Sequence, residues 1–161
     1  MKTFKIVIIV FCVLAFQTVI NGYISIFGIN PNFALISVVV LSILYPDYKY
    51  MGIVAVITGL ILDFITSGVF GLNTLLLLYV SQLTCYFAKQ FLNDNFMSVL
   101  LITFLGTVLF ESIYYLFNSI NYISFNLIKA FVRIVLPAGL YNAVISMIVY
   151  PIIKKYVSVS K

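Results

Sequence analysis

Six apolar runs follow one another along this chain of 161 residues, and the polar stretches between them are short. A helix needs about 20 apolar residues to cross the roughly 30 Å hydrocarbon core of a bilayer, and most of these runs approach that length. Only 8% of the residues are charged, against about 25% in a soluble domain, so polar surface is too scarce to cover a water-soluble globule. The sequence therefore predicts an all-α polytopic membrane protein, with six transmembrane helices in one bundle.

A single integral membrane domain is expected over residues 1–161, because no linker is long enough to separate two domains. Asn30 before Pro31 has the pattern of a helix N-cap followed by proline at the first helical position. The last run exceeds the hydrocarbon core, so we expect either a kink at Pro137 or a segment, 126–132, lying along the interface. The six spans are expected at about 4–20, 31–45, 50–65, 69–88, 96–117 and 131–153.

The basic residues predict the orientation of the bundle. With the N-terminus inside, only Lys129 and Arg133 fall on the outer side, and the other cations are cytoplasmic. This is the bias of the positive-inside rule, and an even number of spans places both termini on one side. We expect a multi-pass protein of the cytoplasmic membrane with cytoplasmic N- and C-termini. The cytoplasmic lysines would be Lys2, Lys5, Lys49, Lys89, Lys154, Lys155 and Lys161.

Two acids, one guanidinium and one amide are predicted to share the outer leaflet: Asp63, Glu111, Arg133 and Asn73. Charges at such depth normally pair or face a wet cavity, so we expect a structural or partner-binding polar cluster. Within it, the Arg133 guanidinium should approach Glu111 or Asp63 to about 4–6 Å. Two alternatives remain open: each charge reaches the nearby surface by itself, or Asp63 caps a helix end through the turn that follows it.

The sequence shows no catalytic or metal-binding constellation. It contains no His, which is the commonest general base and a common zinc ligand, and no Gly-x-Ser-x-Gly elbow or phosphate loop. Asp63 and Glu111 lack the paired aspartate motifs of intramembrane aspartyl proteases. The net charge of +5 is spread thinly over loop ends, which does not indicate nucleic-acid binding. We therefore expect no enzymatic activity, no metal, no cofactor and no nucleic-acid partner.

Short motifs of glycine, proline and asparagine mark the starts and ends of the predicted spans. In chain order they are Pro31-Asn32-Phe33, Gly59-x-x-x-Asp63, Gly68-x-x-Gly71-Leu72-Asn73, Leu136-Pro137 and Leu140-Tyr141-Asn142, with Pro151 before a basic tail. Each motif is weak alone, and their order and spacing carry the match. Over nearly its whole length, the chain resembles the bacterial rod shape-determining protein MreD family.

This resemblance implies a non-enzymatic subunit of the bacterial cell-elongation complex. Such a subunit would scaffold a single-span MreC-like protein and, through it, associate with MreB filaments and with the RodA polymerase and its transpeptidase. Membrane lipid is a further expected partner. The small residues Gly52 and Gly59 would permit a homodimer as readily as packing within the bundle.

The same resemblance supplies an alternative function. MreD proteins are thought to look like the substrate-binding membrane subunits of energy-coupling-factor vitamin transporters. Such a subunit needs outer loops that close over its ligand, and the connection at residues 66–68 is too short for a lid. Only residues 21–30 and 118–123 could serve, so the sequence favours the scaffold.

Reporter fusions test the predicted orientation. A cytoplasmic reporter fused after Lys161 should be active, and a periplasmic reporter at the same position should be silent. The same two reporters inserted at 118–123 should give the opposite pattern. A periplasmic signal at Lys161 would overturn the six-span arrangement.

Overall fold

The computed structural model describes residues 10, 12–19, 28–66, 68–91, 96–119 and 127–158. Its regular elements within these ranges are helices, which confirms the all-helical prediction. Residues 12–19 are helical and belong to the first predicted span, much of which lies outside the described residues. The other elements are α2 (Phe33–Leu44), α3 (Tyr48–Ile65), α4 (Leu72–Phe91), α5 (Phe96–Ser119), α6 (Leu127–Ala130), η1 (Phe131–Val135) and α7 (Leu136–Ser158).

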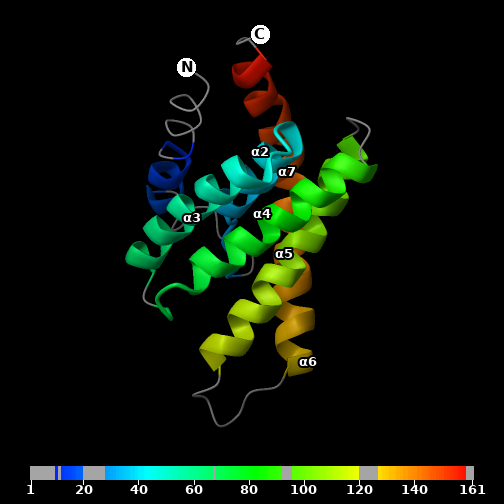
Figure 1. Cartoon of the computed structure of the whole chain (residues 1–161). Coiled ribbons are helices and arrows are strands. Elements are labelled where there is room, and N and C mark those ends of the chain that lie inside the picture. The colour runs from blue at the N-terminus through cyan, green and yellow to red at the C-terminus, as the bar shows by residue number, and fades with distance from the viewer. Residues whose placement is uncertain are drawn as a thin grey trace.

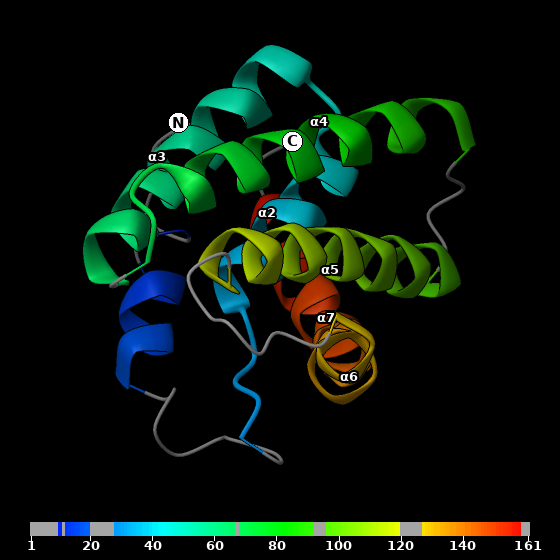
Figure 2. The same ribbon diagram turned by 90° about the horizontal axis from the view of Figure 1, so that it is seen from below.

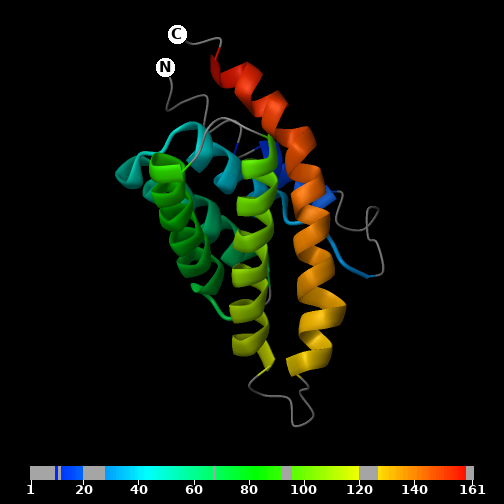
Figure 3. The same ribbon diagram turned by 90° about the vertical axis from the view of Figure 1, so that its right-hand side faces the viewer.

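The helices form one bundle in which sequence neighbours pack as antiparallel pairs. α3 lies beside α4, as the short connection between them requires, and α5 lies beside the long helix that ends the chain (Figure 1). Seen from below, α2 lies inside the ring formed by the other helices (Figure 2). The end of α7 and the start of α5 lie at one end of the bundle, which we call the C-terminal end (Figure 3). The end of α3, the start of α4 and α6 lie toward the opposite end.

The central helix α2 is the most deeply buried element, with every residue from Ala34 to Ile43 buried. It is apolar on all sides, and such a helix is stable only when neighbours cover it completely. Its 12 residues extend about 18 Å at 1.5 Å per residue, well short of the roughly 30 Å hydrocarbon core. The short second run is thus shielded by its neighbours instead of crossing a bilayer alone.

Among the residues that the structure describes, three helical stretches are long and apolar enough to cross a membrane: Tyr48–Ile65, Phe96–Phe117 and Ile128–Tyr156. α4 has 20 residues but is not among them, since Asn73, Gln82 and Lys89 lower its mean hydropathy. These stretches indicate a membrane protein, and the count of six spans stays a prediction.

The last helix continues past Pro137 through a π-helical turn, with no sharp kink there. α6, η1 and the first part of α7 follow one axis, whereas the C-terminal turns of α7 lean away from it (Figure 3). Residues 127–132 therefore extend the helix and do not turn along an interface as one alternative proposed. In η1 the Leu136 N–H donates to the Phe131 carbonyl, five residues back. Pro137 follows at once. A proline ring clashes with the carbonyl four residues before it in a regular α-helix, and the wider π-turn relieves that clash.

Gly59 allows α3 and α4 to approach closely. A Cβ atom there would lie 2.4 Å from the Thr74 Cα and 2.8 Å from the Thr74 backbone N. Backbone atoms cannot move aside as a side chain can, so any larger residue at position 59 would separate the two helices. The Gly59-x-x-x-Asp63 motif therefore fixes where α4 begins relative to α3.

Gly59→Ala should lower the free energy of unfolding by about 1–3 kcal/mol, because the added methyl group meets backbone atoms. Gly52→Ala is the matched control on the same helix, since its Cβ would lie 2.9 Å from the Gln82 Nε2, the end of a flexible side chain. SDS-induced unfolding of detergent-solubilised protein, followed by circular dichroism, measures both. A Gly52→Ala variant as unstable as Gly59→Ala would contradict this account.

Candidate functional site: two helix starts inside the bundle

Asp63, near the end of α3, caps the start of α4. Its Oδ1 accepts the Asn73 backbone N–H at 3.0 Å, and its Oδ2 accepts the Thr74 backbone N–H at 3.1 Å and the Thr74 hydroxyl. The carboxylate is buried, with 5% of its residue exposed. A negative charge at a helix N-terminus is stabilised both by these unpaired N–H groups and by the helix dipole. Asp63 thus performs for α4 the role that a local N-cap residue usually has.

The conformation of the connection between α3 and α4 places the start of α4 beside Asp63. Gly71, immediately before α4, has φ +89°, a left-handed conformation that favours glycine. The Asn73 side chain donates from its Nδ2 to the Thr66 Oγ1 at 3.1 Å, which closes the turn from the other side. We call Asp63, Thr66, Asn73 and Thr74 the Asp63 cluster. Its hydrogen bonds connect the end of α3 to the first turn of α4.

The four residues expected to form one outer-leaflet cluster fall into different surroundings. The structure brings Asp63 and Asn73 together, through capping and not through an ion pair. Glu111 is half-buried on α5, and Arg133 is exposed on η1. Among the described residues, Arg133 forms no ion pair with Glu111 or Asp63 at 4.0 Å or less, and its expected approach to an acid within about 4–6 Å stays a prediction. A shared depth does not place two side chains on facing surfaces.

A second capped helix start lies at α2. The N-cap is Asn32, whose Oδ1 accepts the Leu35 N–H at 3.0 Å, and not Asn30 as the sequence pattern predicted. Two distant side chains complete it. The Gln17 Oε1 accepts the Ala34 N–H at 2.8 Å, and the Asn142 Oδ1 of α7 accepts the Asn32 N–H at 3.0 Å. These bonds connect three separate helical segments at one point.

Asn142 also reaches α5, where its Nδ2 donates to the Thr107 Oγ1 at 3.4 Å. We call Gln17, Asn32, Thr107 and Asn142 the Asn142 cluster. Thr107 stands in the middle of α5, so α2 begins midway along the bundle and runs to its C-terminal end. Non-helical backbone at such depth is tolerated only where protein covers it, and Pro31, just before the cap, is buried.

Four of the seven motif positions named from the sequence shape or belong to these clusters. Gly59 and Gly71 shape the Asp63 cluster, while Pro31 and Asn142 belong to the start of α2. Gly68 is exposed in the α3–α4 turn, Pro137 follows η1, and Tyr141 is half-buried on α7. Sequence reasoning missed Gln17, Thr74 and Thr107 as participants. Each is a polar residue in or next to an apolar run, which is the one signal that could have marked them.

Within the described ranges, no three His, Cys, Asp or Glu side chains gather as metal ligands. The two clusters instead consist of amide, hydroxyl and carboxylate groups that bond to backbone N–H groups and to one another. Their chemistry is therefore that of fixing helices in place.

The apolar helices and their internally capped starts define a helical membrane protein. The family model of the rod shape-determining protein MreD matches residues 1–159 of the chain. The chain therefore belongs to the MreD family, whose members determine cell shape as structural membrane proteins and are not a known enzyme family. No curated protein and no solved structure matches the chain.

Asp63→Ala should lower the free energy of unfolding by about 1.5–3 kcal/mol. The substitution removes the carboxylate that accepts hydrogen bonds from Asn73 and Thr74 in the native protein, so these buried donors lose their partner. The matched control is Asp47→Ala. Asp47 caps α3 by accepting hydrogen bonds from the Lys49 and Tyr50 N–H groups at 3.0 and 3.2 Å. Because Asp47 is exposed, water can replace its carboxylate, and the variant should lose only about 1 kcal/mol of unfolding free energy. SDS-induced unfolding compares the two variants. Equal losses would show that burial of the Asp63 cap adds nothing.

Proposed function

We propose that this protein is a non-enzymatic scaffold of the bacterial cell-elongation complex, and that it holds the transmembrane helix of a single-span MreC-like partner. Through that partner it would act on the peptidoglycan-synthesis machinery and on MreB filaments. Membership of the MreD family supports a role in rod shape. The observation that supports a docking role is a groove between α4 and α5.

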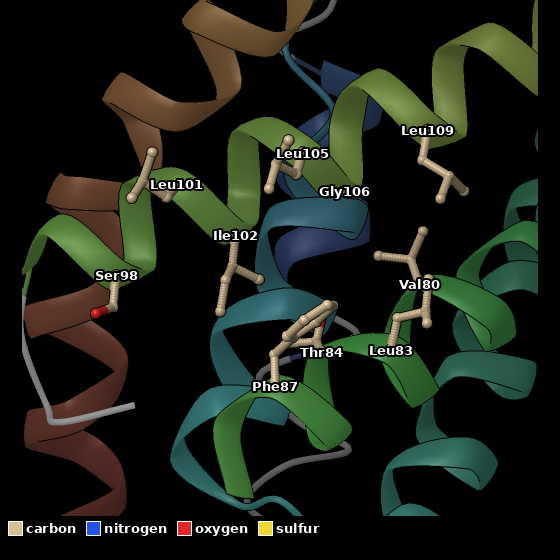
Figure 4. A pocket seen from close by; sticks show the side chains of 10 residues that line it. All are labelled: Val80, Leu83, Thr84, Phe87, Ser98, Leu101, Ile102, Leu105, Gly106 and Leu109. Carbon is tan, nitrogen blue, oxygen red and sulfur yellow. The ribbon is translucent and has the colours of Figure 1, made fainter. Parts of the chain in front are cut away.

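The α4–α5 groove has a volume of about 330 Å³, and side chains of both helices face each other across it (Figure 4). Its lining is mostly apolar, with the small polar side chains of Thr84 and Ser98. On α5 it extends from Ser98 to Leu109, about 16 Å along the helix axis. Leu101 and Leu105 are 51% and 61% exposed, so the groove opens toward the surroundings of the bundle.

Small residues make this groove suitable for a helix. In a membrane, helices associate through close packing, and Gly, Ser and Thr let two backbones approach. Gly106 lines the groove, and a Cβ there would lie 3.2 Å from the Val80 Cγ1, so the groove floor is already tightly packed. A partner helix with apolar side chains could rest on this floor without leaving a polar group unpaired.

The Asp63 and Asn142 clusters also favour a scaffold over a transporter subunit. A vitamin-binding subunit presents polar groups to its ligand, whereas both oxygens of Asp63 accept hydrogen bonds from α4. Asn142 likewise uses its oxygen and its nitrogen within the bundle. The substrate-binding subunit of an energy-coupling-factor transporter therefore stays the weaker alternative.

Leu101→Trp and Leu105→Trp should each reduce recovery of the MreC-like partner about tenfold, because indole bulk in the groove costs about 1–3 kcal/mol of packing. The measurement is co-purification with the tagged protein at matched expression, together with cell width. Leu140→Trp on α7 is the control, since that leucine is 60% exposed but lies outside the groove. Equal partner loss in all three variants would place the docking surface elsewhere.

The scaffold role itself has a separate readout. Depletion of the protein should round rod-shaped cells and leave vitamin uptake unchanged. A specific uptake defect in cells of normal shape would favour the transporter-subunit alternative.

A further inference from the structure

The hydroxyl of Thr84 in the α4–α5 groove differs from those of two other buried threonines. Thr58 and Thr107 each donate to the carbonyl four residues earlier in their own helix, at 2.7 and 2.8 Å. Thr84 is 2% exposed and lines the groove, yet it makes no hydrogen bond to any residue that the structure describes. Thr103 also lacks a partner there, but it is completely enclosed and does not line the groove. In hydrocarbon an unpaired hydroxyl is costly, so a group that enters the groove and bonds to Thr84 is favoured.

Thr84 stands about one helical turn from the glycine of the groove. Val80 packs against Gly106, and Thr84 follows Val80 by four residues, about 6 Å along α4. Ser98 precedes Gly106 by eight residues, about 12 Å along α5, and the antiparallel arrangement places it on the same side of the glycine as Thr84. Figure 4 shows Ser98 at one end of the groove and Leu109 at the other. The hydroxyls therefore lie between the glycine and the C-terminal end of the bundle.

We propose that the partner helix in this groove carries a hydrogen-bonding side chain four positions from a small residue. The small residue rests on Gly106, and the hydrogen-bonding side chain meets the Thr84 hydroxyl. Residues four apart lie on the same face of a helix, about 6 Å apart along its axis, which matches the spacing of the two groups in the groove. This inference rests on the docking role proposed for the α4–α5 groove.

The hydrogen bond would fix the register of the partner helix. Apolar side chains pack almost equally well when a helix slides along an apolar groove, whereas a hydrogen bond forms at one position only. A threonine hydroxyl both donates and accepts, so Asn, Gln, Ser or Thr of the partner fits it, and Leu or Val leaves it unpaired. Hydrogen bonds between helices are a common means of association in membranes. Thr84 thus selects the partner by chemistry as well as by shape.

A second groove, with a volume of about 490 Å³, lies between the first helix, α2 and α7 and offers a contrast. It also contains a buried hydroxyl, since Ser37 of α2 is 2% exposed. Its lining includes no glycine, and the Phe16 and Phe33 rings meet there edge to face, with centroids 5.3 Å apart. Bulky rings hold a helix backbone at a distance. Of these two grooves, the α4–α5 groove alone combines a glycine with a buried hydroxyl.

Thr84→Val removes the hydroxyl and keeps the shape of the side chain, so it should reduce recovery of the co-expressed MreC-like partner about threefold. Thr84→Ser keeps the hydroxyl and should retain full recovery. Two control variants should also retain it: Thr58→Val makes the same change outside the groove, and Ser37→Ala removes the buried hydroxyl of the second groove. SDS-induced unfolding of Thr84→Val alone should match that of the wild type, because the hydroxyl bonds to no described residue of the bundle.

A double-mutant cycle then identifies the side chain of the partner. Each Asn, Gln, Ser or Thr in the membrane span of the partner is changed to Leu in turn, and recovery is measured with the wild-type protein and with Thr84→Val. One of these changes should reduce recovery about threefold with the wild type and have no further effect with Thr84→Val. A Gly, Ala or Ser should stand four positions from that residue in the partner.

Full recovery with Thr84→Val would overturn this inference, and so would a loss that Thr84→Ser shares or an equal loss in Ser37→Ala. A partner span in which no position is coupled to Thr84 would overturn it as well. The variants Leu101→Trp and Leu105→Trp separate this outcome from failure of the docking role. If they still release the partner, the docking role stands and only the hydrogen bond is wrong. If they too retain it, the docking role fails.

Discussion

The bundle depends on how the starts of two internal helices satisfy their backbone N–H groups. The first four N–H groups of any helix lack partners within it, and inside an apolar bundle no water replaces them. α4 begins against α3, and Asp63 supplies acceptors from ten and eleven residues earlier in the chain. α2 begins midway along the bundle, where Gln17 and Asn142 supply acceptors from two other helices. At both helix starts, the hydrogen bonds that cap the helix also connect segments that are distant in sequence. The same bonds therefore serve both capping and tertiary packing.

The pattern of apolar and polar residues in the sequence predicted the class of fold and part of the candidate site. Apolar runs separated by short turns predicted the helices, and a lone carboxylate in an apolar run singled out Asp63. The partners of Asp63 could not be predicted in the same way. Depth along a helix says which residues share a leaflet, but not which faces meet, so depth could not decide whether Arg133 pairs with an acid. The alternative in which Asp63 caps a helix through the following turn is close to the structure, with the cap placed on α4.

Residues whose roles depend on a distant partner could not be predicted from local pattern. Gln17 ends an apolar run and looks like an interfacial residue, yet its amide oxygen reaches α2. Asn30 before Pro31 has the local pattern of a cap, but Asn32 takes that role because Asn142 fixes its backbone N–H. Pro137 predicted a kink, whereas the π-turn of η1 adds one residue and keeps the axis. That extra residue rotates everything before it by about 100° relative to a regular helix, which periodicity alone cannot anticipate.

The buried helix α2 lies at the level of both described grooves, between the middle of the bundle and its C-terminal end. Toward the first helix and α7, Phe33 and Ser37 of α2 line the groove directly. Toward α4 and α5, Gly106 stands between α2 and α4, with Val39 and Val80 within 4 Å of where its Cβ would be. One side of the same buried helix thus faces a groove of about 490 Å³ walled by rings, and the other side faces a groove of about 330 Å³ that contains a glycine. The glycine allows a helix backbone to approach the smaller groove closely, which favours that groove for the partner helix.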